Sequence, residues 1–319
     1  MSSFPSVVRK PRALRPGAKL AYFAPASPVS DAAETQSGVQ ELERHGFQVF
    51  SAQEILPSGY FAGTTEQRLI GFQDALRDAQ VDGLVALRGG YGSTYLLDSL
   101  LRDTLGKLHT PKCLIGYSDL TSLQTYLWQM EIWVTFHGPM LAAGFRQGAG
   151  KPGGYDESSF LQAVTNVSGN WSINLQGECI SEGVAEGGLL GGCLSILQTS
   201  LGTPWEIDTE NTILILEDTH SKAYQVDRAL MHLKQAGKLS SVRGFLLGEF
   251  PNSEPAVAGS PTVREVCERI LRPFHVPIVY GAPIGHTPRP MLTLPLGVRA
   301  RLHAKGEGTL EILEPAVVE

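Results

Sequence analysis

The sequence is poor in charge, and it has few cysteines. Charged residues make up 18% of the 319 residues and the net charge is −6. A basic excess of the kind that marks a nucleic-acid surface is therefore missing, and we expect no nucleic-acid partner. The cysteines are Cys113, Cys179, Cys193 and Cys267, which form no CxxC pair. This scatter predicts neither a disulfide framework nor a zinc site, and it fits a reducing cytoplasm.

Long apolar runs are also missing. No stretch approaches the roughly 20 apolar residues of a membrane helix, and residues 1–12 lack the apolar core of a signal peptide. We expect no membrane contact and a cytoplasmic location. Hydrophobic residues nevertheless make up 42% of the chain, which is enough for a substantial core, and the length favours two domains.

The first half of the chain alternates short apolar runs with helical patterns. Strands are predicted at Lys19–Phe23, Gly83–Leu87 and Cys113–Gly116, among others, with helices between them. Strand, loop and helix in repetition predict an α/β domain with a mostly parallel sheet and helices on both faces, which we assign to residues 1–145.

The second half is predicted to begin after a linker. Residues 146–186 are rich in Gly, Ser, Asn and Pro and weakly periodic, so we interpret them as an inter-domain linker or loop. Residues 187–319 are predicted to form a smaller α/β domain that is β-rich after Pro273. Three helix starts are expected from capping patterns, at Asp31-x-x-Glu34, Thr64-x-x-Gln67 and Ser260-Pro261.

The sharpest local feature is Gly116-Tyr117-Ser118-Asp119-Leu120, which joins an apolar strand to a helix. This layout suits a nucleophile elbow, in which a tight turn lifts the serine hydroxyl out of the sheet. Leu120 stands where the full hydrolase elbow has a second glycine. From this segment alone, a serine N-cap on an ordinary helix is the stronger alternative.

A nucleophilic serine needs a histidine base and an orienting carboxylate. By position, His137, His220 and His286 are candidates for the base. Glu217 ends an apolar strand, where open α/β sheets place site residues, although a strand-end charge facing water would look the same. The other five histidines are expected to be solvated: His45, His109, His232, His275 and His303.

The segment Arg88-Gly89-Gly90-Tyr91-Gly92 also ends a strand. It matches neither a P-loop nor a dinucleotide fingerprint. Glycines permit close approach, so the loop is interpreted as bringing backbone N–H groups to a reacting oxygen, with a simple tight turn as the alternative.

Together these segments resemble one family, the LD-carboxypeptidases, which include muramoyltetrapeptide carboxypeptidases and the related microcin C self-immunity proteins. Further segments that carry the resemblance are Ala24-Pro25-Ala26-Ser27-Pro28, Phe136-His137-Gly138-Pro139, Gly191-Gly192-Cys193-Leu194, Glu217-Asp218 and Pro283-Ile284-Gly285-His286. The resemblance covers nearly the whole chain. It departs at Cys193, where the family pattern has Asn.

The resemblance implies a fold, a site and a reaction. The fold would be a Rossmann-like N-terminal domain with a smaller β-rich C-terminal domain, in a chain that tends to form homodimers. The catalytic residues would be Ser118, Glu217 and His286, with backbone N–H groups of Asp119 and Gly90 as oxyanion donors. The reaction would release a terminal D-amino acid from a small murein peptide without metal or organic cofactor. Substrate-binding candidates are Arg88, Gly89 and Tyr91.

Other functions stay open at this point. A microcin C immunity-type peptidase would share the chemistry and need an aromatic residue to stack on adenine, for which Trp171 is a candidate. A non-catalytic protein that closes two domains on a small ligand is a second alternative. An NAD-dependent enzyme has little support, because the first strand runs into Ala-Pro-Ala-Ser-Pro rather than a dinucleotide fingerprint.

Overall fold

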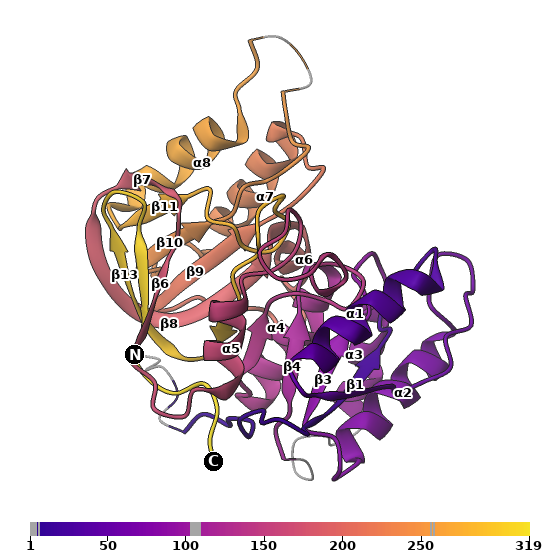
Figure 1. Cartoon of the computed structure of the whole chain (residues 1–319). Coiled ribbons are helices and arrows are strands. Elements are labelled where there is room, and N and C mark those ends of the chain that lie inside the picture. Colours follow the sequence, from indigo (N-terminus) through magenta and orange to yellow (C-terminus); the bar gives the residue numbers. More distant parts are fainter. Residues whose placement is uncertain (1–4, 6, 103–109, 256, 258) are drawn as a thin grey trace.

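The computed structural model describes residues 5, 7–102, 110–255, 257 and 259–319, and its strands form two sheets (Figure 1). His109, expected to be solvated, lies outside the described residues. None of the helices in this described part combines the length and the apolar composition of a membrane span.

The first sheet is parallel except at one edge. Its strands, in spatial order, are β12 (Leu294–Leu296), β5 (Thr135–His137), β4 (Cys113–Gly116), β3 (Gly83–Ala86), β1 (Lys19–Phe23) and β2 (Gln48–Ser51). Only β12, which comes from the second half of the chain, runs antiparallel to its neighbour β5. The predicted mostly parallel sheet is confirmed.

Helices cover both faces of this sheet because alternate strand residues point to opposite sides. They are α1 (Ala32–Arg44) on one face, and α2 (Thr65–Arg77), α3 (Thr94–Arg102) and α4 (Thr121–Glu131) on the other. On β1, Leu20 shares a core cluster with Leu42 of α1, whereas Phe23 contacts Phe72 of α2 with ring centroids 5.2 Å apart.

The predicted helix starts were right at Asp31 and Thr64 and two residues early at Ser260. Thr64 and Gln67 form the expected reciprocal capping box on α2. Asp31 caps α1 alone, because Glu34 pairs with Arg146 instead of turning back. The later helix, α8 (Val263–Leu271), begins two residues beyond the predicted cap because Thr262 forms its own capping box with Glu265.

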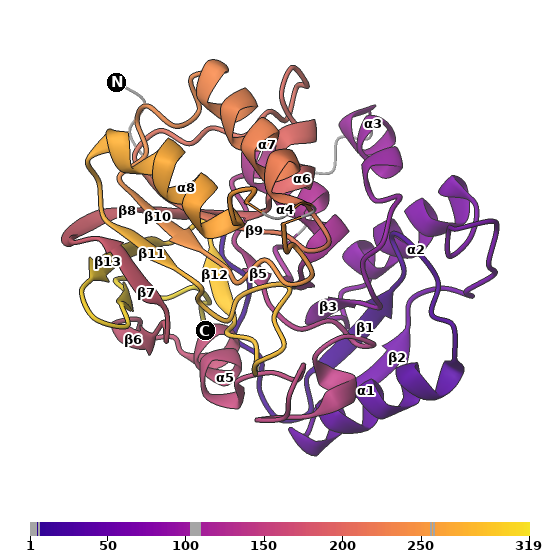
Figure 2. The ribbon, with the colours of Figure 1, turned by 90° about the horizontal axis from the view of Figure 1, so that it is seen from above.

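The second sheet is mixed, with a parallel centre formed by β8 to β11. Its strands, in spatial order, are β6 (Trp171–Asn174), β14 (Thr309–Ile312), β13 (Arg299–Ala304), β8 (Gly183–Cys193), β9 (Thr212–Glu217), β10 (Gly244–Leu247), β11 (Ile278–Tyr280) and β7 (Glu178–Ser181). One face is covered by α6 (Leu194–Thr199), α7 (Ala223–Gln235) and α8, and Figure 2 shows α7 and α8 side by side.

The stretch 146–186, expected to be a linker, contains regular structure. It holds α5 (Glu157–Thr165), the edge strands β6 and β7, and the start of β8; the 3₁₀ turn η3 (Phe145–Gln147) precedes α5. Edge strands of four residues with exposed outer positions give little apolar periodicity, which explains why the pattern looked like a loop. The division of the chain into domains at this stretch remains a prediction.

The two sheets share one core cluster. Ile115 of β4, Ile215 of β9 and Leu294 of β12 all belong to it and are fully buried. The halves of the chain are therefore joined by contiguous apolar contact, which fixes the position of one sheet relative to the other.

Candidate functional site

The carboxyl ends of strands from both sheets meet at one place, which is where open α/β sheets bind ligands. Ser118 follows β4, His137 ends β5 and Glu217 ends β9. His286 lies in the loop after β11. Ser118, Glu217 and His286 lie more than 60 residues apart in the chain. The fold rather than the local sequence therefore assembles the site.

Ser118 lies on a sharp turn between β4 and α4. It starts the 3₁₀ turn η2 (Ser118–Leu120), is half-buried, and has a φ of 62°. A non-glycine residue in this left-handed region is strained, and such strain gathers at functional sites. The same geometry marks nucleophile elbows.

The side chain of Asp119 is occupied elsewhere. Its Oδ2 accepts a 2.8 Å hydrogen bond from the Ser93 backbone N–H, just before α3. Asp119 is buried, and its carboxylate therefore anchors the start of α3 rather than reaching the site. The role expected from the sequence concerns only the backbone N–H of Asp119 and not this carboxylate.

Glu217 and His286 form a tight, directional pair. The carboxylate Oε2 accepts from the His286 ring Nδ1 at 2.7 Å and from the His286 backbone N–H at 2.9 Å. Glu217 is fully buried, whereas the His286 side chain keeps 18% of its surface exposed. Because Nδ1 donates to the carboxylate, the neutral ring carries its lone pair on Nε2.

The pKa values of the pair are shifted in opposite directions. Burial opposes ionisation of Glu217, but the His286 charge and hydrogen bonds outweigh it and lower the pKa of Glu217. Burial also works against a charged His286, but the Glu217 charge and hydrogen bond raise the pKa of His286 above its usual 6.5. The pair thus favours a carboxylate that stabilises an imidazolium.

A cavity of about 560 Å³ opens beside this pair. Its lining includes Ser118, His286, His220 and the loop residues Arg88, Gly89 and Gly90, and we call it the Ser118 pocket. Among the hydrogen bonds of the described residues, none joins Ser118 Oγ to His286, although both border the cavity. Catalytic hydrogen bonds are often long in the absence of substrate.

The glycine loop approaches Ser118 as expected. A Cβ on Gly89 would lie 2.7 Å from both Cβ and Oγ of Ser118, so only glycine fits there. The Gly90 N–H donates to no acceptor within the described part of the chain, while the next N–H, of Tyr91, donates to Ser27 Oγ at 3.3 Å. The Gly90 N–H is therefore without an acceptor in a loop residue that lines the Ser118 pocket.

Two of the predicted binding residues do not border the pocket. Tyr91 is 44% exposed and lies in an aromatic group with Tyr60, Phe61 and Tyr95. Trp171, the candidate for adenine stacking, lies on the edge strand β6 and lines a separate cavity with Asp156. Trp171 is thus not placed to stack on a ligand at Ser118.

Arg68 is a structural residue that sequence reasoning missed. Its guanidinium is fully buried and donates to the carbonyls of Pro25, Gly63 and Gly92. It thereby ties the loop after β1 to the loop after β3, on which Gly89 and Gly90 lie. Its position on α2, among apolar core positions, gave no signal in the sequence.

One group in the described residues has metal-ligand spacing. Candidate ligand atoms of Cys193, Glu217 and His286 lie within 4.8 Å of one another. Burial raises the pKa of the Cys193 thiol well above its usual value of 9.0, which keeps it protonated at neutral pH. Any metal there would also compete with the Glu217–His286 hydrogen bond.

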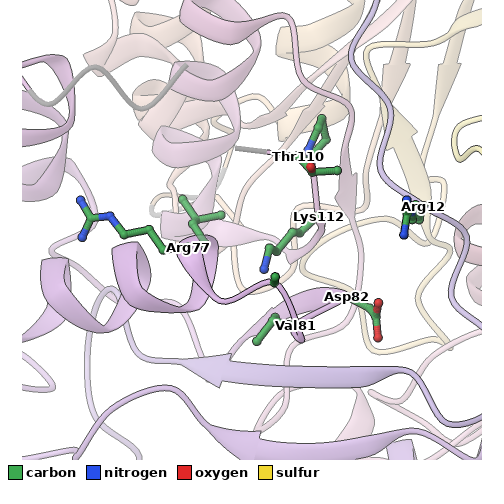
Figure 3. A pocket seen from close by; sticks show the side chains of 9 residues that line it. Arg12, Arg77, Val81, Asp82, Thr110 and Lys112 are labelled. Carbon is green, nitrogen blue, oxygen red and sulfur yellow. The ribbon is translucent and has the colours of Figure 1, made fainter. Parts of the chain in front are cut away.

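A second cavity, of about 310 Å³, lies at the amino ends of β3 and β4, and Figure 3 shows side chains that line it. Its lining includes Arg12, Asp82 and Lys112, of which Asp82 and Lys112 directly precede the strands β3 and β4. The Lys112 ammonium already donates to the carbonyls of Ala75 and Asp78. Because ligands in such sheets bind at the carboxyl ends of the strands, the Ser118 pocket is the stronger candidate.

Comparison with known proteins identifies the family. Sequence models of the LD-carboxypeptidase N-terminal and C-terminal domains match residues 20–138 and 186–302. A "Probable murein peptide carboxypeptidase" from Bacillus subtilis (strain 168) is 33% identical over 297 residues, covering 92% of this chain and 91% of the relative.

Two further similarities span most of the chain. The microcin C7 self-immunity protein MccF from Escherichia coli is 27% identical over 313 residues, covering 89% of this chain and 90% of MccF. The crystal structure of muramoyltetrapeptide carboxypeptidase from Oxalobacter formigenes superposes with a TM-score of 0.81 at 30% identity, covering 93% of this chain and 99% of that one. With both halves matched in order, the protein is an enzyme of the LD-carboxypeptidase family.

Proposed function

We propose that this protein is a serine carboxypeptidase that cleaves the amide between an L-centre and a C-terminal D-amino acid. The substrate would be a small murein peptide, such as the tetrapeptide in which D-Ala follows meso-diaminopimelate. The observation that carries the proposal is the buried Glu217–His286 hydrogen bond beside the cavity that Ser118 borders. Relatives named as murein peptide and muramoyltetrapeptide carboxypeptidases support the substrate class.

In the proposed mechanism, Nε2 of neutral His286 takes the proton of Ser118 as its Oγ attacks the scissile carbonyl. Glu217 stabilises the imidazolium that forms. The backbone N–H groups of Asp119 and Gly90 donate to the oxyanion, and each such donor is typically worth roughly 2.7–4 kcal/mol. His286 then gives its proton to the leaving amine, and water hydrolyses the acyl-enzyme. None of these steps needs a metal or an organic cofactor.

Arg88 is the proposed partner of the terminal carboxylate. It borders the Ser118 pocket, and among the described residues its Nη1 donates only to the neutral carbonyl of Pro28, at 3.2 Å. The other pocket arginine, Arg146, already pairs with Glu34 at 2.5 Å. The guanidinium of Arg88 can therefore pair with the carboxylate of a substrate. Gly89 would let the substrate backbone approach, and Tyr91 would contact it only outside the cavity.

The test is mass-spectrometric release of D-Ala from defined tri-, tetra- and pentapeptides. We expect release from the tetrapeptide and none from a tetrapeptide ending in L-Ala. An aminoacyl-sulfamoyl nucleotide is assayed in parallel, because MccF is a relative. Turnover of the nucleotide mimic with no D-Ala release would support the microcin-type alternative. Binding of both compounds without turnover would support the non-catalytic one.

The proposal also covers the cellular compartment and the oligomeric state of the protein. All four cysteines are free, which supports a reducing compartment, and we propose a cytoplasmic enzyme that acts on recycled wall peptides. We also propose a homodimer. Light scattering of the purified protein tests this directly, and a single species of one-chain mass would refute it.

A further inference from the structure

The second oxygen of Glu217 faces a histidine from the other sheet. His137 ends β5, between Gly116 of β4 and Leu294 of β12. Its Nε2 lies 3.9 Å from Glu217 Oε1, and both side chains are fully buried. In the described part of the chain, Glu217 Oε1 has no hydrogen-bond partner, and neither ring nitrogen of His137 has one.

Buried polar atoms without partners are rare and costly, and here two such groups face each other. Burial lowers the pKa of His137, the nearby His286 lowers it further, and the Glu217 charge opposes both. The ring is therefore neutral at neutral pH, with one N–H and one lone pair. Tyr117 also contacts His137, with its ring edge-on and the ring centroids 6.1 Å apart.

We propose that His137 is a positioning residue whose Nε2–H holds Oε1 of Glu217, so that Oε2 stays aimed at His286. If the proton were on Nδ1 instead, the lone pair of Nε2 would face Glu217 Oε1, which is also an acceptor. The gap of 3.9 Å closes to a normal N–H···O distance of about 2.7–3.2 Å by a movement of about 1 Å. The proposal rests on the proposed function for its kinetic readout only.

The contact also crosses between the sheets. His137 ends a strand of the first sheet and Ser118 follows one, whereas Glu217 ends a strand of the second sheet and His286 lies in a loop that follows one. A hydrogen bond from His137 to Glu217 therefore helps to fix the position of His286, the proposed base, relative to Ser118, the proposed nucleophile. His137 does not border the Ser118 pocket, so it acts through Glu217 and not on the substrate.

Two variants separate this role from packing. His137→Phe keeps a ring but removes the donor, whereas His137→Gln keeps a donor near the position of Nε2. We expect His137→Phe to lower kcat roughly 10- to 100-fold, as for loss of a hydrogen bond to a buried charge, with KM nearly unchanged. His137→Gln should restore most of the loss.

The pH profile adds a second readout. Without the donor, the Glu217 carboxylate is a stronger base and favours the His286 imidazolium more, so the acid limb of kcat/KM should move to higher pH in His137→Phe. Wild-type kcat and an unmoved acid limb in His137→Phe would overturn the proposal. Equal losses in the Phe and Gln variants would do the same, because they would indicate packing alone.

A measurement without substrate keeps the proposal testable if His137→Phe does not fold. In protein labelled with ¹⁵N-histidine, we expect the His137 Nε2 signal, assigned by its loss in His137→Gln, to be protonated at neutral pH. An unprotonated Nε2 would overturn the proposal whatever the substrate proves to be. Absence of D-Ala release with a protonated Nε2 would count against the proposed function only.

Discussion

Replacing Gly285 by alanine should disable the site while changing nothing chemical in it. Gly285 precedes His286 and has a φ of 60°. A Cβ there would lie 2.2 Å from the Glu217 carboxyl carbon and 2.5 Å from Oε2. Contacts between carbon atoms are optimal at about 3.5–4.0 Å, so Glu217 or the loop must move by about 1 Å or more.

The expected losses follow from that displacement. A misplacement of about 1 Å can cost roughly 100-fold in rate, and we expect kcat of Gly285→Ala to fall by at least about that factor. An alanine at positive φ also costs about 1–2 kcal/mol of stability. The backbone effect has to be separated from the contact with Glu217.

Gly281→Ala is the matched control. Gly281 lies in the same loop with a φ of 76°, and no atom lies within 4 Å of its ideal Cβ position. Both variants should lose similar stability in urea unfolding, but only Gly285→Ala should lose D-Ala release from the tetrapeptide. Equal kcat values for the two variants would refute the reasoning that Glu217 must hold its present position.

Three further predictions concern pH, metal and the terminal carboxylate. Because Glu217 raises the pKa of His286, the active neutral base is lost as pH falls through that value, so the acid limb of kcat/KM should lie above 6.5 and move lower in Glu217→Gln. Dialysis against EDTA should leave turnover unchanged, and activity that is lost and then restored by zinc would contradict the proposed mechanism. Arg88→Ala should raise KM for the tetrapeptide about 10-fold or more with little change in kcat, while Arg146→Ala changes KM less; the reverse order would assign the carboxylate to Arg146.

The fold was largely predictable because the strands and helices of the first sheet have strong local sequence patterns. Cys113–Gly116 is a buried apolar run, and the Thr64–Gln67 capping box fixes a helix start without tertiary help. The 146–186 stretch failed for the opposite reason. Its strands lie at sheet edges, where few side chains are buried, so tertiary pairing rather than pattern makes them strands.

The grouping of Ser118, Glu217 and His286 was predicted from segment order rather than from local chemistry, and their catalytic roles stay a prediction. Ser118 alone looked like an N-cap, and its φ of 62° is visible only in three dimensions. Glu217 and His286 become recognisable as a pair only in the folded chain, where His286 Nδ1 lies 2.7 Å from Glu217 Oε2. Arg68 could not have been found, since an arginine on a helix is ordinarily solvated and only the buried loops around it explain its place.

The central claim is that Ser118 attacks the peptide, and one measurement tests it most directly. Wild-type protein and Ser118→Ala are incubated with a tetrapeptide ending in D-Ala, and released D-Ala is followed by mass spectrometry. We predict steady release by the wild type and background release by a folded Ser118→Ala variant. Release at the wild-type rate by Ser118→Ala would contradict the account.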